Sequence, residues 1–145
     1  MFDIPHDQLS RNKQLKESNV GLNRGTIKRQ WGYYKVLHKG DGYTVKELTI
    51  LPGKSLSDQR HFKRDEHWFV VKGTLMMDLQ SEHFSGKMYK IMLTVNPNDN
   101  THQLCDWTIA RETWHRPYNE GTDNVVVIET WTGESSESDI ERRNQ

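Results

Sequence analysis

"QRHFKRDEHWFVVKG", residues 59–73, places two histidines, a glutamate and a glutamine ahead of an apolar run that ends in glycine. The apolar run predicts a buried β-strand, in which alternate side chains share one face. Glu66 therefore shares a face with Trp68 and Val70, whereas His67 points to the opposite face. Because a glutamate beside two apolar side chains is costly to bury alone, we expect Glu66 to have a partner.

A polar cluster around Glu66 is the first candidate for a functional site. Upstream of the strand, Gln59, His61 and Lys63 are expected to share one face, so His61 and Glu66 can converge across a tight turn. His115, in "ARETWHRPYN", precedes the last long strand, and a barrel can bring it to the same point. Imidazole, carboxylate and amide oxygen together suit zinc, iron, manganese or nickel. The alternative reading is a satisfied polar hairpin with solvated ends.

Composition restricts the class of protein. The 145 residues fit one domain, and 20 basic side chains balance 20 acidic ones, so no net field favours nucleic acid or an anionic membrane. Cys105 is the single cysteine, which excludes an internal disulfide framework and fits a reducing compartment. No long apolar run predicts a signal peptide or a membrane span. We therefore expect a cytoplasmic protein with no nucleic-acid or membrane partner.

Short β-rich runs separated by Gly, Pro and Asn turns predict the fold class. The first two, Trp31–Leu37 and Tyr43–Leu51, flank "HKGDG", a hairpin turn of the Asp-Gly type. Later runs recur at roughly ten-residue spacing, the pattern of an all-β sandwich or barrel. We expect an N-terminal arm over residues 1–28, one domain over 29–141, and a polar tail that packs loosely at one end.

The central region resembles a known family. It keeps "WGYY" at 31–34, "GDGY" at 40–43 and "PG" at 52–53, and then Gln59, His61, Arg64, Glu66, His67, Trp68 and Gly73. This pattern is similar to the cupin domain of type II mannose-6-phosphate isomerases, which is usually the C-terminal part of bifunctional mannose-1-phosphate guanylyltransferases. The resemblance runs from about Gln30 to Ile140. It implies an all-β cupin, a double-stranded β-helix or jelly-roll barrel.

The same resemblance implies a metal site and a reaction. The four ligands are expected to be Gln59, His61, Glu66 and His115. They are expected to hold a divalent metal ion, zinc first, with manganese, nickel or iron as alternatives. The activity implied is interconversion of mannose 6-phosphate and fructose 6-phosphate, in the pathway to GDP-mannose and polysaccharide precursors.

The chain departs from the family pattern at three places. Lys63 stands where the family has a second histidine, and a lysine ammonium cannot ligate a metal without losing its proton. Ala110 and Glu112 replace a proline and a glycine in the second motif. The segment between Gly73 and Thr108 is also longer than the family leads us to expect.

Aldose–ketose isomerisation moves a proton between C2 and C1, so it needs a base, a stabiliser of charge on oxygen and a cation for the phosphate. Glu129 on the final strand is the predicted base. Lys46 and Arg116 are the first candidates for the catalytic cation that holds the phosphate. Lys63 and Arg64 at the rim are further candidates and are predicted to bind substrate. Each of these side chains has an ordinary alternative role, as a solvated strand residue or a surface ion-pair partner.

Two other function classes are weighed against the isomerase. Guanylyl transfer needs a Gly-rich phosphate loop that these residues do not contain, so we do not expect it from this sequence. A non-catalytic or differently specific carbohydrate-binding cupin remains the alternative, because the motif is altered at Lys63 and a fold does not fix a function. A homodimer is also expected to be possible through an open sheet edge such as Trp31–Leu37.

Overall fold

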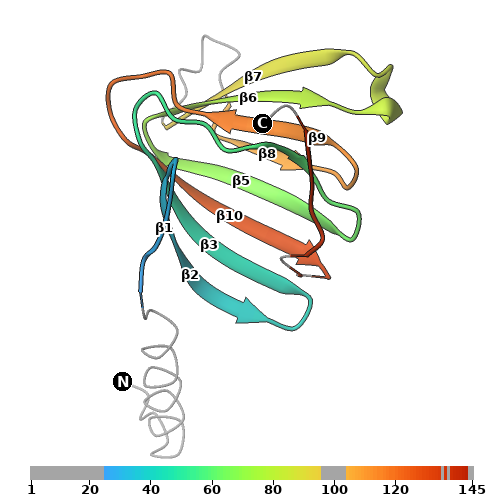
Figure 1. Ribbon diagram of the computed structural model, residues 1–145, viewed down its shortest axis with the longest axis horizontal. Coiled ribbons are helices and arrows are strands. Elements are labelled where there is room, and N and C mark those ends of the chain that lie inside the picture. The colour runs from blue at the N-terminus through green and yellow to red at the C-terminus, as the bar shows by residue number, and fades with distance from the viewer. Residues whose placement is uncertain (1–24, 96–103, 135, 137, 144–145) are drawn as a thin grey trace, which may run out of the picture.

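Two antiparallel β-sheets form the computed structural model of this chain, which describes residues 25–95, 104–134, 136 and 138–143 (Figure 1). The larger sheet has six strands in the order β1 (Ile27–Arg29), β2 (Gly32–Gly40), β3 (Tyr43–Ile50), β10 (Val125–Gly133), β5 (Arg64–Lys72) and β8 (Asp106–Ile109). The smaller sheet has five, in the order β11 (Glu141–Arg143), β4 (Asp58–Arg60), β9 (Trp114–Tyr118), β6 (Thr74–Gln80) and β7 (Met88–Thr94). Within the described residues the helical content is one 3₁₀ turn, Glu82–Phe84. The predicted all-β fold is confirmed.

The chain changes sheet on each side of β5. Residues 61–63 carry it from β4 in the smaller sheet to β5 in the larger one. At Gly73 the chain crosses back to β6, with a φ of +80° that favours glycine. A Cβ atom at Gly73 would also lie 2.9 Å from the backbone oxygen of Asn124. These two crossings place β4 and β5, which are neighbours in sequence, on opposite walls of the interior.

The longer predicted strands correspond to observed ones. The hairpin expected at "HKGDG" joins β2 and β3 with Gly40 paired to Tyr43, so the turn residues are Asp41 and Gly42. Three short strands, β1, β9 and β11, were not predicted, because three to five residues give too little alternation to recognise. The strand segment expected around Gln59 corresponds to β4, which ends at Arg60. Strand β1 pairs with the start of β2, so the expected open edge is covered over Gly32–Tyr34.

The ends of the domain also differ from expectation. The tail does not pack loosely, because Glu141–Arg143 form β11 and pair with Arg60, Gln59 and Asp58 of β4. The predicted arm over 1–28 lies mainly outside the described residues, and β1 begins within its last part at Ile27. No helix among the described residues is long and apolar enough to cross a membrane.

The interior between the sheets is apolar at one end and polar at the other. Along β10 the inward side chains are Val125 and Val127, then Glu129 and Trp131, all buried. The valines belong to the main core, which contains Tyr34, Leu48, Ile50, Leu56, Trp68, Val70, Leu75, Met77, Leu79, Leu93, Ile109, Val125 and Val127. The polar end is where the residues predicted to act in function gather.

Candidate functional site

Three of the four predicted metal ligands meet in the interior. One ligand atom from each of His61, Glu66 and His115 lies within 4.8 Å of the other two, and all three side chains are buried. His61 directly follows β4 and His115 lies on β9, both in the smaller sheet, whereas Glu66 lies on β5 in the larger sheet. Because the chain crosses between the sheets at residues 61–63, the two histidines of the smaller sheet point toward the carboxylate of the larger sheet. His67, next in sequence, points outward and pairs with Asp106.

Backbone carbonyls fix the orientation of both imidazoles. His61 Nδ1 lies 2.6 Å from the carbonyl oxygen of Asp139, and His115 Nδ1 lies 2.9 Å from that of Thr113. A carbonyl can only accept, so each Nδ1 must carry its proton and donate it. The other ring nitrogen, Nε2, then carries a lone pair in the neutral imidazole. Metal-binding histidines are commonly oriented in this way, with one nitrogen donating to a carbonyl and the other facing the ion.

Glu66 is held as a carboxylate at the centre of the cluster. Its Oε1 lies 2.9 Å from His61 Nε2, and its Oε2 accepts a hydrogen bond of 2.9 Å from the indole N–H of Trp68. Burial raises the pKa of the Glu66 carboxyl, but the neighbouring imidazoles of His115 and His61 lower it more, so the pKa lies well below its usual value. The cluster thus presents a negative charge to any cation that enters it.

The surroundings of His115 Nε2 indicate whether these residues can bind a metal ion. This atom lies 3.3 Å from Glu66 Oε2, within ion-pair range, yet it forms no hydrogen bond with the described residues. A neutral imidazole lone pair and a carboxylate oxygen repel each other at that distance unless a positive charge lies between them. Two imidazole nitrogens and a carboxylate are also a donor set that divalent transition metals accept. The residues therefore fit a divalent cation.

Arg64 joins this cluster to a neighbouring cavity. Its Nε donates to Glu66 Oε1 and its Nη2 donates to His61 Nε2, each over 3.2 Å. Its guanidinium carbon lies 3.4 Å from the centre of the Trp131 ring, and its Nη1 donates to the carbonyl of Ser136. The side chain is buried and well ordered by these contacts. Arg64 therefore supplies positive charge to two of the three cluster residues.

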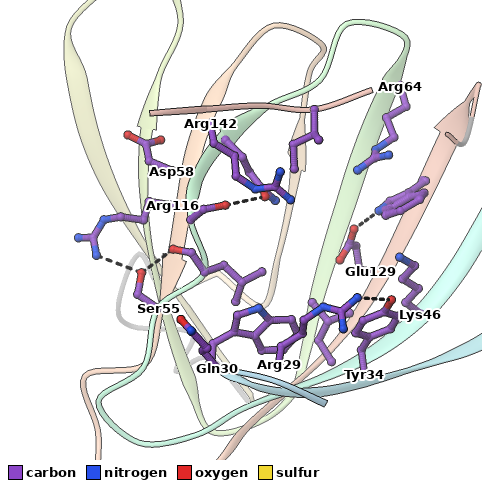
Figure 2. A pocket seen from close by; sticks show the side chains of 17 residues that line it. Arg29, Gln30, Tyr34, Lys46, Ser55, Asp58, Arg64, Arg116, Glu129 and Arg142 are labelled. Carbon is purple, nitrogen blue, oxygen red and sulfur yellow. Dashed lines mark hydrogen bonds between the residues drawn. The ribbon is translucent and has the colours of Figure 1, made fainter. Parts of the chain in front are cut away.

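The cavity has a volume of about 660 Å³ and opens between the two sheets (Figure 2). Its lining carries five cationic side chains, Arg29, Lys46, Arg64, Arg116 and Arg142, and two acidic ones, Asp58 and Glu129. Trp31, Tyr34 and Trp131 supply aromatic surface. In a chain with no net charge, this excess of cations is local and suits an anionic ligand of small-molecule size.

Lys46 and Glu129 both line the cavity. They are direct cross-strand partners on β3 and β10, and both are buried. Trp131 donates its indole N–H to Glu129. Lys46 Nζ lies 3.7 Å from the ring centre of Trp131 and 4.6 Å from that of Tyr34. A carboxylate and an ammonium are thus held next to the cavity in a fixed relation to one indole.

The remaining predicted residues lie at different distances from this centre. Gln59 lines the cavity and is the cross-strand partner of His115, and its Oε1 accepts a hydrogen bond from Ser57. Arg116 also lines the cavity, but its guanidinium is bound to Asp78 at 2.7 Å. Lys63 is exposed, lies 3.6 Å from Glu134 and does not line the cavity.

Several residues at the site were not predicted from the sequence. Arg29 and Arg142 line the cavity, and Asp139 holds His61 through its carbonyl. The carboxylate of Asp139 also accepts hydrogen bonds from the backbone N–H groups of Phe62 and Lys63. In the tail, the only local signal for Asp139 and Arg142 was the charged stretch "SDIERR", and no such signal marked Arg29.

Comparison with known sequences identifies similar proteins. The family model described as mannose-6-phosphate isomerase C-terminal matches residues 16–145. A mannose-1-phosphate guanylyltransferase of Salmonella muenchen is 35% identical over 121 residues, which cover 82% of this chain and 22% of that protein. The alginate biosynthesis protein AlgA of Pseudomonas aeruginosa is 34% identical over 121 residues, 83% of this chain and 22% of that protein. The chain thus spans about a fifth of the length of these relatives.

Solved structures share the fold at low sequence identity. The capsular polysaccharide assembling protein CapF of Staphylococcus aureus superposes with a TM-score of 0.70 at 15% identity, over 83% of this chain and 32% of CapF. At this identity the likeness concerns the arrangement of strands alone.

Proposed function

This chain belongs to the mannose-6-phosphate isomerase C-terminal family, and on that premise we propose that it interconverts mannose 6-phosphate and fructose 6-phosphate as a metal-dependent cupin. The observation that carries the proposal is the set of His61, Glu66 and His115 beside a cation-rich cavity, with His115 Nε2 left without a hydrogen bond among the described residues. A buried nitrogen without a partner is costly unless a ligand completes it.

His61, Glu66 and His115 would hold a divalent ion, with Gln59 on the neighbouring strand as the fourth predicted ligand. When bound, the ion would stabilise negative charge that develops on the substrate oxygens during isomerisation. Arg64 lies against the same carboxylate and limits how close the substrate can approach Glu66. In this proposal His61, Glu66 and His115 therefore bind the ion and do not transfer protons.

Glu129 is the residue placed to move the substrate proton. Its carboxylate lines the cavity and is oriented by the indole N–H of Trp131. In the forward direction it would take the proton from C2 of the open-chain aldose and return the same proton to C1, while the hydroxyl proton at O2 leaves and O1 gains one. Lys46, its cross-strand partner, would donate hydrogen bonds to the sugar oxygens.

A second candidate function, binding of a sugar phosphate without catalysis, is favoured by one specific observation. Arg64 already donates hydrogen bonds to His61 Nε2 and to Glu66, so the protein itself satisfies the lone pair of this imidazole and the charge of this carboxylate. A cavity of the same shape and charge could then bind an anionic carbohydrate without any ion.

One experiment separates the two functions. The purified chain is loaded with zinc, manganese, nickel or iron, its metal content is measured by mass spectrometry, and conversion of mannose 6-phosphate to fructose 6-phosphate is followed. The isomerase predicts one bound ion and turnover, both lost in His115→Ala. His67→Ala is the matched control, because His67 is the outward neighbour of Glu66 and pairs with Asp106. Bound metal with no turnover, or no bound metal, would reject the isomerase.

A further inference from the structure

We propose that Arg142 and Arg29 together bind the phosphate group of the sugar phosphate. This inference rests on the proposed function. The two arginines come from β11 and β1, short strands at the ends of the two different sheets. Both side chains line the cavity, and Figure 2 shows them on opposite sides of it. A planar guanidinium offers paired N–H donors that match the oxygens of a phosphate.

Arg142 belongs to a row of side chains that begins at the metal ligands. His115 on β9 is paired with Gln59 on β4, and Gln59 is paired with Arg142 on β11. Cross-strand partners project from the same face of a sheet, so this row leads from the cluster to the cavity lining, where Gln59 and Arg142 lie. Adjacent strands are about 5 Å apart, so the backbone of Arg142 lies about 10 Å from that of His115. That separation suits a hexose whose C1 and C2 lie near the cluster and whose phosphate is on C6.

Arg142 has no competing partner in the part of the chain that the structure describes. Its guanidinium forms no hydrogen bond or ion pair with residues 25–95, 104–134, 136 or 138–143, although its backbone is fixed in β11. Arg29 is oriented on the other wall by its hydrogen bond of 3.4 Å to the hydroxyl of Tyr34, and it lies over that ring. Its Nη1 also donates to the carbonyl of Lys28 over 3.0 Å. Both contacts involve neutral groups and leave the positive charge of Arg29 available to an anion.

The other cations of the cavity are already engaged. Arg116 is bound to the carboxylate of Asp78, and Arg64 to Glu66. Lys46 is the cross-strand partner of Glu129 and lies against two aromatic rings. An anionic group would have to displace a carboxylate or a packed ring to reach any of these three. Arg142 and Arg29 can receive a phosphate without breaking an ion pair.

The test compares binding of mannose 6-phosphate and of unphosphorylated mannose to the metal-loaded full chain by calorimetry, alongside steady-state kinetics. The variants are Arg142→Gln, Arg29→Gln and Arg142→Lys. We expect each glutamine variant to weaken mannose 6-phosphate binding about tenfold or more, because a charge-assisted pair of hydrogen bonds is lost. KM should rise with kcat nearly unchanged, and mannose binding should not change. Arg142→Lys should recover part of the loss, since it keeps the charge but not the paired donors.

The matched control is Arg111→Gln, which removes one positive charge from an exposed side chain that lies 3.6 Å from Asp65 outside the cavity. This control should bind mannose 6-phosphate like the wild type. Wild-type affinity in both Arg142→Gln and Arg29→Gln, or equal wild-type affinity for mannose and mannose 6-phosphate, overturns the phosphate site. Phosphate-dependent binding that requires Arg142, but without turnover, supports the site and rejects the isomerase instead.

Discussion

Trp131 donates its indole N–H to the carboxylate of Glu129, two residues before it on the same strand. The same ring lies within 4 Å of the cationic groups of Arg64 and Lys46, which come from β5 and β3 on either side of β10. One indole therefore orients the predicted base and both neighbouring cations. This relationship makes Trp131 a positioning residue, because its contacts with Glu129, Arg64 and Lys46 fix their geometry.

Replacing Trp131 by phenylalanine should separate these roles. The aromatic face stays available to Arg64 and Lys46, but the donor to Glu129 is lost. A hydrogen bond to a charged group contributes about 1.5–3 kcal/mol, so we expect kcat for mannose 6-phosphate to fall about tenfold or more while KM changes little. Steady-state kinetics of the metal-loaded protein provide the measurement.

Trp114→Phe is the control for loss of an indole. Trp114 is packed by Arg60 and Arg143 on the face of β9 opposite to His115, so this variant should lose some stability and no turnover. Equal kcat in Trp131→Phe and wild type would show that the indole N–H does not serve the base.

Lys63, despite its place in the motif, is expected to be dispensable. Its side chain is 59% exposed and its ammonium lies 3.6 Å from Glu134, and an exposed pair of this kind contributes at most about 1 kcal/mol to stability. Lys63→Ala and Lys63→His should therefore keep kcat and KM within about twofold of wild type. A large rise in KM for Lys63→Ala would mean that this side chain reaches the substrate after all.

Gly32, at the start of β2, is predicted to be sensitive to the smallest side chain. A Cβ atom there would lie 2.0 Å from the backbone oxygen of Thr49, and the φ of +150° is unusual for other residues. Gly32→Ala should lower the free energy of unfolding by about 2 kcal/mol or more, measured by denaturant titration. Gly42→Ala isolates the backbone effect, because φ is +77° and nothing lies within 4 Å; its cost should be about 1 kcal/mol. An equal fall in the free energy of unfolding in Gly32→Ala and Gly42→Ala would show that the contact with Thr49 does not cause the effect at Gly32.

Asp139 should make stability depend on acid pH. Burial opposes its ionisation, but hydrogen bonds from the backbone N–H groups of Phe62 and Lys63 outweigh this and lower its pKa below the ordinary value of 3.8. The unfolded chain then binds the proton more readily than the folded one, so the stabilisation is present above pH 3.8 and is lost as pH falls through the lower folded pKa.

The midpoint of thermal unfolding, compared between wild type and Asp139→Asn across acid pH, measures this contribution. The wild type should have the higher midpoint above pH 3.8, and the difference should shrink below that pH. A difference that is constant across this range would assign the effect of the substitution to packing and not to charge.

Local patterns were sufficient for the fold class and for part of the site. The period of two along β5 separates buried Glu66 from His67, because alternation is a property of the strand itself. The same argument fails for Gln59, His61 and Lys63. Strand β4 ends at Arg60 and the next residues cross between sheets, so His61 is buried while Lys63 is exposed. The alternation of buried and exposed side chains holds within one strand, but it does not continue through a segment that crosses between sheets.

Contacts between distant segments could not be read from the sequence. Arg29 and Arg142 reach the cavity only because β1 and β11 pair at the ends of their sheets, and each of these strands has three residues. Nothing in so short a polar stretch indicates a strand partner. The contact of Asp139 with His61 likewise joins positions 78 residues apart.

The pairing of β4 with β11 has a consequence for biosynthesis. Strand β4 (residues 58–60) cannot pair with β11 (residues 141–143) until about eighty further residues have been synthesised. Only then is the carbonyl of Asp139 in place to accept the hydrogen bond that orients His61. Until then His61 is free to rotate, and the pair it forms with Glu66 is not yet fixed. The geometry of the His61, Glu66 and His115 cluster is thus complete only after residues 139–143 have been made, which places any binding of an ion by this cluster after that step.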